Sequence, residues 1–142
     1  MDKGIQRELK KVAKKYKLQL LVFFGSRVTD KYRENSDFDF AFYPEKNIDF
    51  DTYSNLLFEI SNIIKADNID LIDIKNNDDP ILRKEILLNG MCIFEKYPYL
   101  FEEYKINSYF NYLDYLHYYL EIDEVIDNKL DILKNYAKSL EN

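Results

Sequence analysis

Residues 37–43, with the sequence Asp-Phe-Asp-Phe-Ala-Phe-Tyr, alternate strictly between two kinds of side chain. In a β-strand, successive side chains point to opposite faces of the sheet. The alternation therefore places Asp37, Asp39 and Ala41 on one face and three phenylalanines on the other. Burial of the phenylalanine face in a core fixes the direction in which the two carboxylates point. Pro44 predicts the end of this strand, because proline cannot donate a ladder hydrogen bond.

A second strand is predicted just before this one, over residues 18–24. Its sequence, Leu-Gln-Leu-Leu-Val-Phe-Phe, is almost continuously apolar and ends at Gly25. Runs of this kind are typical of strands that are covered on both faces. We therefore expect a central strand of a sheet.

The rest of the chain alternates between helical and extended patterns up to residue 96 and is helical afterwards. Apolar residues recur at helical spacing over residues 2–17 and 50–66, and Asp79 followed by Pro80 is a typical helix start. We expect helices at 2–17, 50–66 and 80–89, strands at 18–24, 37–43, 69–74 and 91–94, and a short helix and loop within 26–36. This order predicts an α/β (α+β) domain over residues 1–96, with a sheet covered by helices. Residues 97–142 are predicted as a Tyr-rich helical extension, formed by two helices or by one long broken helix.

Placing Asp37 and Asp39 side by side on one face of an apolar sheet costs free energy. Like charges repel each other, and both carboxylates lose water. A divalent cation between them removes this cost. Magnesium prefers oxygen ligands and is commonly held by one or two carboxylates together with substrate phosphates. The pair therefore predicts a magnesium site.

A third carboxylate would complete a site for two magnesium ions, and residues 69–74 offer two candidates. Asp70 and Asp73 are three residues apart, so they lie on opposite faces of the predicted strand and at most one joins Asp37 and Asp39. Asp70 sits inside the apolar run, where an unpaired charge is expensive. Asp73 lies near the strand end, where a loop can satisfy it. We favour Asp70.

Gly25, Ser26 and Arg27 follow the predicted central strand and are candidates for nucleotide binding. Glycine lets the backbone approach a ligand closely, and N–H groups after a strand can cradle phosphate oxygens. The Ser26 hydroxyl can donate to a phosphate oxygen. Arg27 can meet a triphosphate, although an ordinary surface position explains it too.

Composition excludes several classes of function. The net charge of −6 argues against non-specific nucleic-acid binding, which depends on Lys and Arg at phosphates. No apolar run approaches the 18–20 residues that span a bilayer, so we expect no membrane partner. The single cysteine, Cys92, reads as a buried core thiol, and we expect a cytoplasmic protein.

The pattern Gly25-Ser26, ten residues, then Asp37-Phe38-Asp39, followed by a later apolar-Asp-apolar strand, resembles the nucleotidyltransferase superfamily shared with DNA polymerase beta. The chain looks most like the minimal nucleotidyltransferases, in particular MntA-type antitoxins that work beside HEPN ribonuclease toxins. This resemblance implies a nucleotidyltransferase fold with a mixed sheet. It also implies that Gly25 and Ser26 bind the nucleotide phosphates, and that Asp37, Asp39 and Asp70 are catalytic and hold two Mg²⁺ ions.

The same resemblance implies a protein adenylyltransferase that moves AMP from ATP to a tyrosine of a HEPN toxin and so neutralises it. Two other functions stay open. One is modification of a small molecule, as by aminoglycoside nucleotidyltransferases, which usually carry a larger substrate-binding region. The other is an antitoxin that only masks its toxin by binding, which the intact set of three carboxylates disfavours.

The Tyr-rich extension allows two interpretations. Its aromatic residues can pack on the sheet or form a protein-binding face, since tyrosine is favoured at interfaces. Residues 121–142 hold six acidic residues and three lysines. This acidic end could meet a basic partner, and a solvated helix explains it equally well.

Overall fold

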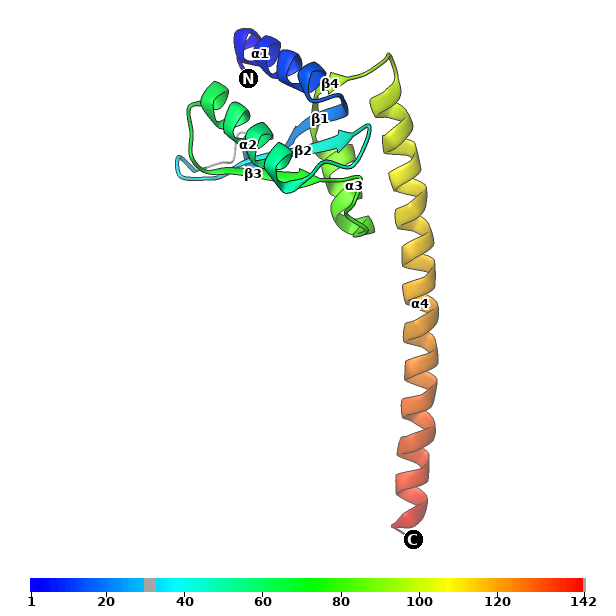
Figure 1. Cartoon of the computed structure of the whole chain (residues 1–142). Coiled ribbons are helices and arrows are strands. Elements are labelled where there is room, and N and C mark those ends of the chain that lie inside the picture. The colour runs from blue at the N-terminus through cyan, green and yellow to red at the C-terminus, as the bar shows by residue number, and fades with distance from the viewer. Residues whose placement is uncertain (30–32, 142) are drawn as a thin grey trace.

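The computed structural model describes residues 1–29 and 33–141, and its helices and strands follow the predicted order. Figure 1 shows them as a small sheet domain from which one long helix projects. The elements are α1 (Lys3–Lys15), β1 (Leu18–Phe24), the 3₁₀ turn η1 (Ser26–Val28), β2 (Phe38–Pro44), α2 (Phe50–Ile64), β3 (Ile69–Asp73), α3 (Pro80–Asn89), β4 (Met91–Glu95) and α4 (Leu100–Leu140).

The four strands form one mixed sheet in the order β3-β2-β1-β4. Strand β1 is antiparallel to both β2 and β4, whereas β2 and β3 run parallel. The parallel pair is joined through α2, as a parallel connection requires a crossover. The structure thus confirms the predicted mixed sheet, and β1 is the central, nearly fully buried strand that its apolar run predicts.

Two apolar layers cover the two faces of the sheet. On one face, Phe40 and Phe42 of β2 pack against α1 and α2, with Leu9 and Leu56 among the buried partners. On the other face, residues such as Ala41 pack against α3 and the first turn of α4. Phe40 and Phe42 are therefore buried, as predicted, and Phe38 is half-buried. The face carrying Asp39 and Ala41 is the one that α3 and α4 cover only in part.

Local signals predicted both ends of α3 correctly. The Asp79 side chain accepts hydrogen bonds from the backbone N–H groups of Ile81 and Leu82, and Pro80 is the first residue of α3. Helix α3 ends at Asn89, immediately before Gly90. Both ends match the predicted start at Asp79-Pro80 and the predicted helix over 80–89, and a glycine after the last residue is a common helix stop.

Several element bounds differ from the predictions by one or two residues, and three differences are larger or closer to the predicted site. Strand β2 begins at Phe38, so Asp37 precedes it, and it includes Pro44. The predicted helix within 26–36 is only the turn η1, and residues 30–32 of that segment lie outside the described residues. The extension is a single unbroken helix, because no glycine or proline occurs after Pro98 to interrupt it. No helix in the described part of the chain is long and apolar enough to cross a bilayer.

Candidate functional site

Asp39 and Asp70 lie directly opposite each other on the neighbouring parallel strands β2 and β3. Residues in register share a face of the sheet. Each is two residues from a residue of the layer under α3 and α4, Ala41 in β2 and Ile72 in β3, so both carboxylates lie on that face. Asp39 is half-buried and Asp70 is exposed. The structure therefore brings together two of the three predicted carboxylates at an open edge of this layer.

Gly25 lies against the Asp39 side chain. Asp39 is in register with Phe24, the last residue of β1, and Gly25 follows at once. A Cβ atom built on Gly25 would stand 2.1 Å from Oδ2 of Asp39. The backbone at Gly25 has φ 83° and ψ −162°, a conformation that is essentially restricted to glycine. Glycine is thus required twice, for its backbone shape and for the room it leaves to a carboxylate, and the exposed Ser26 comes next.

The carboxyl group of Asp39 carries an electrostatic cost. Its pKa is raised above the ordinary value, first by burial and then by the negative charges of Asp70 and Asp37. Both causes disfavour the charged form. A cation or a set of donors beside this carboxylate would relieve the cost.

The segment just before Asp37 and β2 is held by a small hydrogen-bond network. The Arg27 guanidinium donates to the backbone carbonyls of Glu34 (2.8 Å) and Ser36 (2.9 Å), and it lies 3.8 Å from the centre of the Phe38 ring. The Ser36 hydroxyl accepts a hydrogen bond from the backbone N–H of Arg33 (3.0 Å) and so caps this loop. Arg27 therefore positions the loop that leads into β2, and its predicted contact with nucleotide stays a prediction.

Asn68 and Tyr53 support the site, and the sequence did not predict this role for either residue. The Asn68 side-chain amide donates to the backbone carbonyl of Ser36 (2.9 Å), and the backbone carbonyl of Asn68 accepts from the N–H of Phe38 (2.9 Å). The Tyr53 hydroxyl donates to the carbonyl of Leu71 (2.6 Å) and so ties α2 to β3. No local pattern marks either residue, because both contacts join segments that are distant in sequence.

Asp73, the alternative third carboxylate, is in register with Phe42 and lies on the face opposite to Asp70. Its side chain accepts hydrogen bonds from the backbone N–H of Lys75 (3.0 Å) and from the side-chain amide of Asn76 (2.7 Å). Asp73 therefore closes the turn after β3, as a residue near a strand end can.

The donors around Asp39 suit magnesium only together with a substrate. Within residues 1–29 and 33–141, no group of three or more acidic, histidine or cysteine side chains is arranged to hold a metal ion by itself. Magnesium rarely needs such a group, since one or two carboxylates and substrate phosphates usually suffice. The in-register pair Asp39 and Asp70 supplies that number of carboxylates, and both are the hard oxygen ligands that magnesium prefers.

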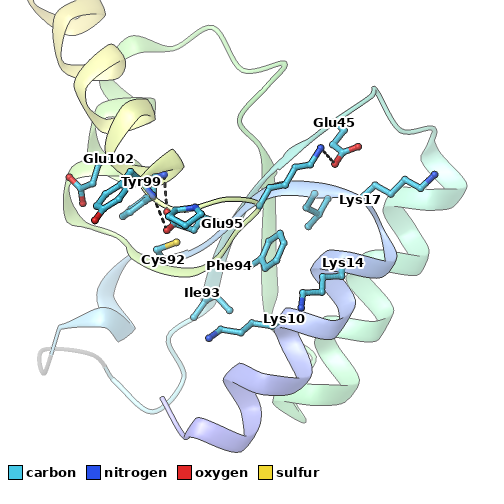
Figure 2. Close-up of a pocket in the computed structure, with 14 residues that line it drawn as sticks. Lys10, Lys14, Lys17, Glu45, Cys92, Ile93, Phe94, Glu95, Tyr99 and Glu102 are labelled. Atoms are coloured by element: carbon cyan, nitrogen blue, oxygen red, sulfur yellow. Dashed lines mark hydrogen bonds and ion pairs between the residues drawn. The ribbon is translucent and has the colours of Figure 1, made fainter.

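A hollow lies elsewhere, beside the free edge of β4 (Figure 2). It measures about 1050 Å³ and is bordered by Lys10 and Lys14 of α1, by Cys92 and Glu95 of β4 and by the start of α4. None of the predicted site residues lines it. Burial raises the pKa of the Cys92 thiol to about 11, so this thiol is a poor nucleophile at neutral pH. We place the candidate site at the carboxylates and not in this hollow, because the hollow gathers no comparable set of reactive groups.

Comparisons with known proteins identify the family and the fold of the chain. The family model described as "Polymerase beta, Nucleotidyltransferase" matches residues 7–99. Curated proteins give no match. Among solved structures, the chain is similar to one from a crystal structure of a toxin–antitoxin with AMP-PNP, with 20% identity, a TM-score of 0.67, and coverage of 88% of this chain and 98% of that one.

A second similar chain comes from a structure of the tri-AMPylated Shewanella oneidensis HEPN toxin in complex with MNT antitoxin. Here the identity is 19% and the TM-score is 0.64, with coverage of 92% of this chain and 99% of that one. At such identities the likeness establishes a shared fold that extends over almost the whole length of the similar chains.

Proposed function

The chain belongs to the polymerase beta nucleotidyltransferase family, and we propose that it transfers AMP from ATP to a tyrosine of a HEPN ribonuclease toxin, which neutralises the toxin. The family membership supports the reaction class. The acceptor is supported by the fold shared with chains from toxin–antitoxin structures, one with AMP-PNP and one with an AMPylated toxin.

One arrangement supports this proposal most strongly, namely Gly25 packed on Asp39 with Asp70 in register beside it. It places a close-approach backbone, an exposed serine and two carboxylates within one corner of the sheet. Triphosphate recognition needs close backbone approach and hydroxyl donors, and magnesium needs carboxylate oxygens.

In this proposal, each residue has a defined role. Gly25 and Ser26 bind the phosphates of ATP, and Asp39 and Asp70, with Asp37 nearby, hold Mg²⁺. Bound Mg²⁺ supplies charge stabilisation at the transferring phosphoryl group. The tyrosine oxygen forms a bond to the α-phosphorus, the bond to the bridging oxygen breaks and pyrophosphate leaves. Asp70, which is the more exposed carboxylate, receives the tyrosine proton.

The test is incubation of the chain with labelled ATP, Mg²⁺ and a HEPN protein encoded beside it, with the label located by mass spectrometry. We expect labelled tyrosine with the unchanged chain. In Asp39→Asn, labelling falls by at least about 100-fold, since metal assistance supplies several kcal/mol. The matched control Asp73→Asn, on the same sheet but on the other face, retains labelling.

The alternatives give different results in the same experiment. Label that appears only on added aminoglycosides would assign the chain to small-molecule modification. Toxin neutralised equally well by Asp39→Asn would assign it to masking by binding alone. Full labelling by Asp39→Asn would contradict the role of this carboxylate.

A further inference from the structure

The second half of α4 contacts no other element of the chain. Every residue from 117 to 140 is exposed, whereas the first turns of the helix are buried against the sheet domain. Near the end of the contact with the domain body, Lys84 lies 4.1 Å from the centre of the Tyr112 ring, and residues 115 and 116 are the last half-buried residues of the helix. Figure 1 shows the helix continuing far beyond the rest of the molecule. A helical segment without tertiary contacts is only marginally stable in water.

This free segment nevertheless carries a continuous apolar stripe. Its residues follow one another at intervals of three or four, which is the spacing that places them on one face of a helix. The stripe consists of Tyr119, Ile122, Ile126, Leu130, Leu133, Ala137 and Leu140. Two of its members, Leu133 and Leu140, are 61% and 68% exposed. A contiguous exposed apolar surface of this kind marks an interface.

Charges beside the stripe indicate what covers it. At 100° per residue, Asp123 and Asp127 in the first half of the stripe and Lys134 and Lys138 in its second half project from the same side. Two further acids lie on this side, Asp131 near the midpoint and Glu141 beyond the end of the stripe. In an antiparallel pair of identical helices, the same side of the stripe on each helix lies against its counterpart, and the two chains run in opposite directions. The acids of one helix then meet the lysines of an identical helix.

The positions of these charges define a single register. The midpoint between residues 123 and 138 is the same as the midpoint between residues 127 and 134, and it falls between residues 130 and 131. One antiparallel alignment about that midpoint therefore pairs Asp123 with Lys138 of the second copy and Asp127 with Lys134 of the second copy. A parallel alignment brings the acids of both copies to the same level.

We propose that residues 119–140 of α4 pair antiparallel with the same residues of a second copy, forming a two-fold symmetric dimer. Such a pair buries the same patch on both subunits, as an isologous interface requires. The paired segment is about 32 Å long at 1.5 Å per residue.

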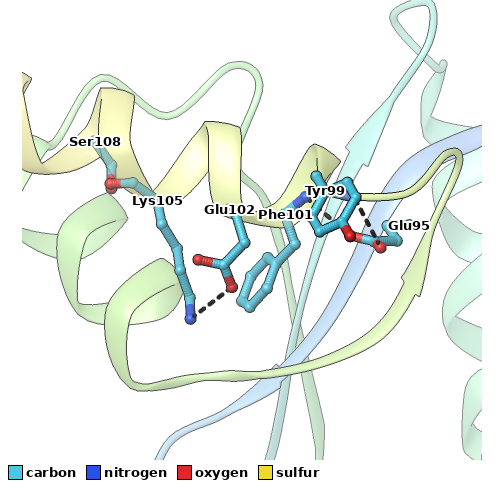
Figure 3. Close-up of polar contacts among 6 residues, drawn as sticks. All are labelled: Glu95, Tyr99, Phe101, Glu102, Lys105 and Ser108. Atoms are coloured by element: carbon cyan, nitrogen blue, oxygen red, sulfur yellow. Dashed lines mark hydrogen bonds and ion pairs between the residues drawn. The ribbon is translucent and has the colours of Figure 1, made fainter.

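The sheet domains leave room for this pairing. In the proposed register, Leu140 of the second copy lies level with residue 121, so it stops short of Tyr112 and α3. The N-terminal end of α4 is held to β4, because the Glu95 carboxylate accepts hydrogen bonds from the backbone N–H groups of Tyr99 (3.2 Å) and Phe101 (3.0 Å), as Figure 3 shows. The two domains therefore stand at opposite ends of the helix pair.

The test is the molar mass of the purified full chain at micromolar concentration, measured by sedimentation equilibrium. We expect a dimer. The double variants Asp123→Lys/Asp127→Lys and Lys134→Asp/Lys138→Asp should each raise the dissociation constant at least ten-fold, because like charges then face each other. Exchange of all four charges in one chain restores the attraction and the dimer.

The control is Glu121→Lys/Glu124→Lys, which makes the same charge change on the side of the helix that faces away from the stripe and leaves the dimer intact. A thermal unfolding curve of each variant checks that the sheet domain is folded. A monomeric chain, including one that associates only with another protein, would overturn the proposal. So would a dimer that both double variants leave unchanged, or one that the four-fold exchange does not restore.

Discussion

Asp39 is the residue at which folding and the proposed chemistry conflict. Burial and two neighbouring acids raise the pKa of its carboxyl group, so folding disfavours the charged form of this side chain. A core residue selected for stability alone would not be charged at this position. Sites that bind metals and substrates commonly contain such perturbed groups.

Asp39→Asn should therefore stabilise the metal-free chain at pH 7. A raised pKa in the folded state means that Asp39 costs no stability below its unfolded pKa, near 3.9. The cost develops as the pH rises through the folded pKa. Thermal unfolding should show a higher Tm for Asp39→Asn at pH 7 and convergence of the two proteins near pH 3. A variant less stable than the parent at pH 7 would contradict this electrostatic account.

Gly25→Ala should destabilise the chain by about 1–3 kcal/mol, the cost of a non-glycine residue in this backbone region. The added Cβ would also displace the Asp39 carboxylate, which lies 2.1 Å from its position. Urea unfolding measures the effect. Gly4→Ala is the matched control, because Gly4 lies in α1 and alanine is the better helix former by about 1 kcal/mol. Equal effects at both glycines would refute the specific role of Gly25.

At the level of elements, the loop before β2 depends on Arg27. Its two hydrogen bonds to backbone carbonyls hold residues 34–36 against η1. Charged hydrogen bonds of this type contribute about 1.5–3 kcal/mol each when buried and less when exposed. Arg27→Ala should lower the free energy of unfolding by about 1–3 kcal/mol, whereas the exposed control Arg7→Ala should change it little. An unchanged stability would assign Arg27 to ligand binding alone.

The elements themselves were predictable because their signals are local. The apolar run of β1, the alternation of β2 and the cap formed by Asp79 each depend on neighbouring residues. The register of Asp39 with Asp70 is different, because it results from pairing between strands that are thirty-one positions apart. The contact of Gly25 with Asp39 and the bridge made by Asn68 are likewise non-local. The residue types of the site were thus readable from the sequence, but their geometry was not.

For the whole molecule, the boundary of the domain is better drawn inside α4 than at residue 96. Leu100 and Phe101 are buried in the layer that covers Leu20, Val22 and Phe24. Residues beyond Tyr112 add nothing to that layer. The sheet domain therefore includes the first turns of the helix, although the sequence changes character near residue 96.

Two truncations test this boundary. A chain ending at residue 112 should unfold cooperatively with a Tm close to that of the full chain. A chain ending at residue 96 loses two buried side chains worth about 2–5 kcal/mol each, a large part of the stability of an ordinary domain. Circular dichroism during heating distinguishes them. Equal stability of the two truncated chains would contradict the boundary within α4.

The proposed function depends most on nucleotide and Mg²⁺ binding at the corner where Gly25, Asp39 and Asp70 meet. Calorimetric titration with a non-hydrolysable ATP analogue tests this binding without any acceptor. The unchanged chain should bind the analogue in the presence of Mg²⁺ and lose affinity when Mg²⁺ is removed. Asp39→Asn and Asp70→Asn should each weaken binding at least about ten-fold, a loss of 1.4 kcal/mol or more, while Asp73→Asn binds as the parent does. Binding that is independent of Mg²⁺, or equally tight in Asp39→Asn, would contradict the account.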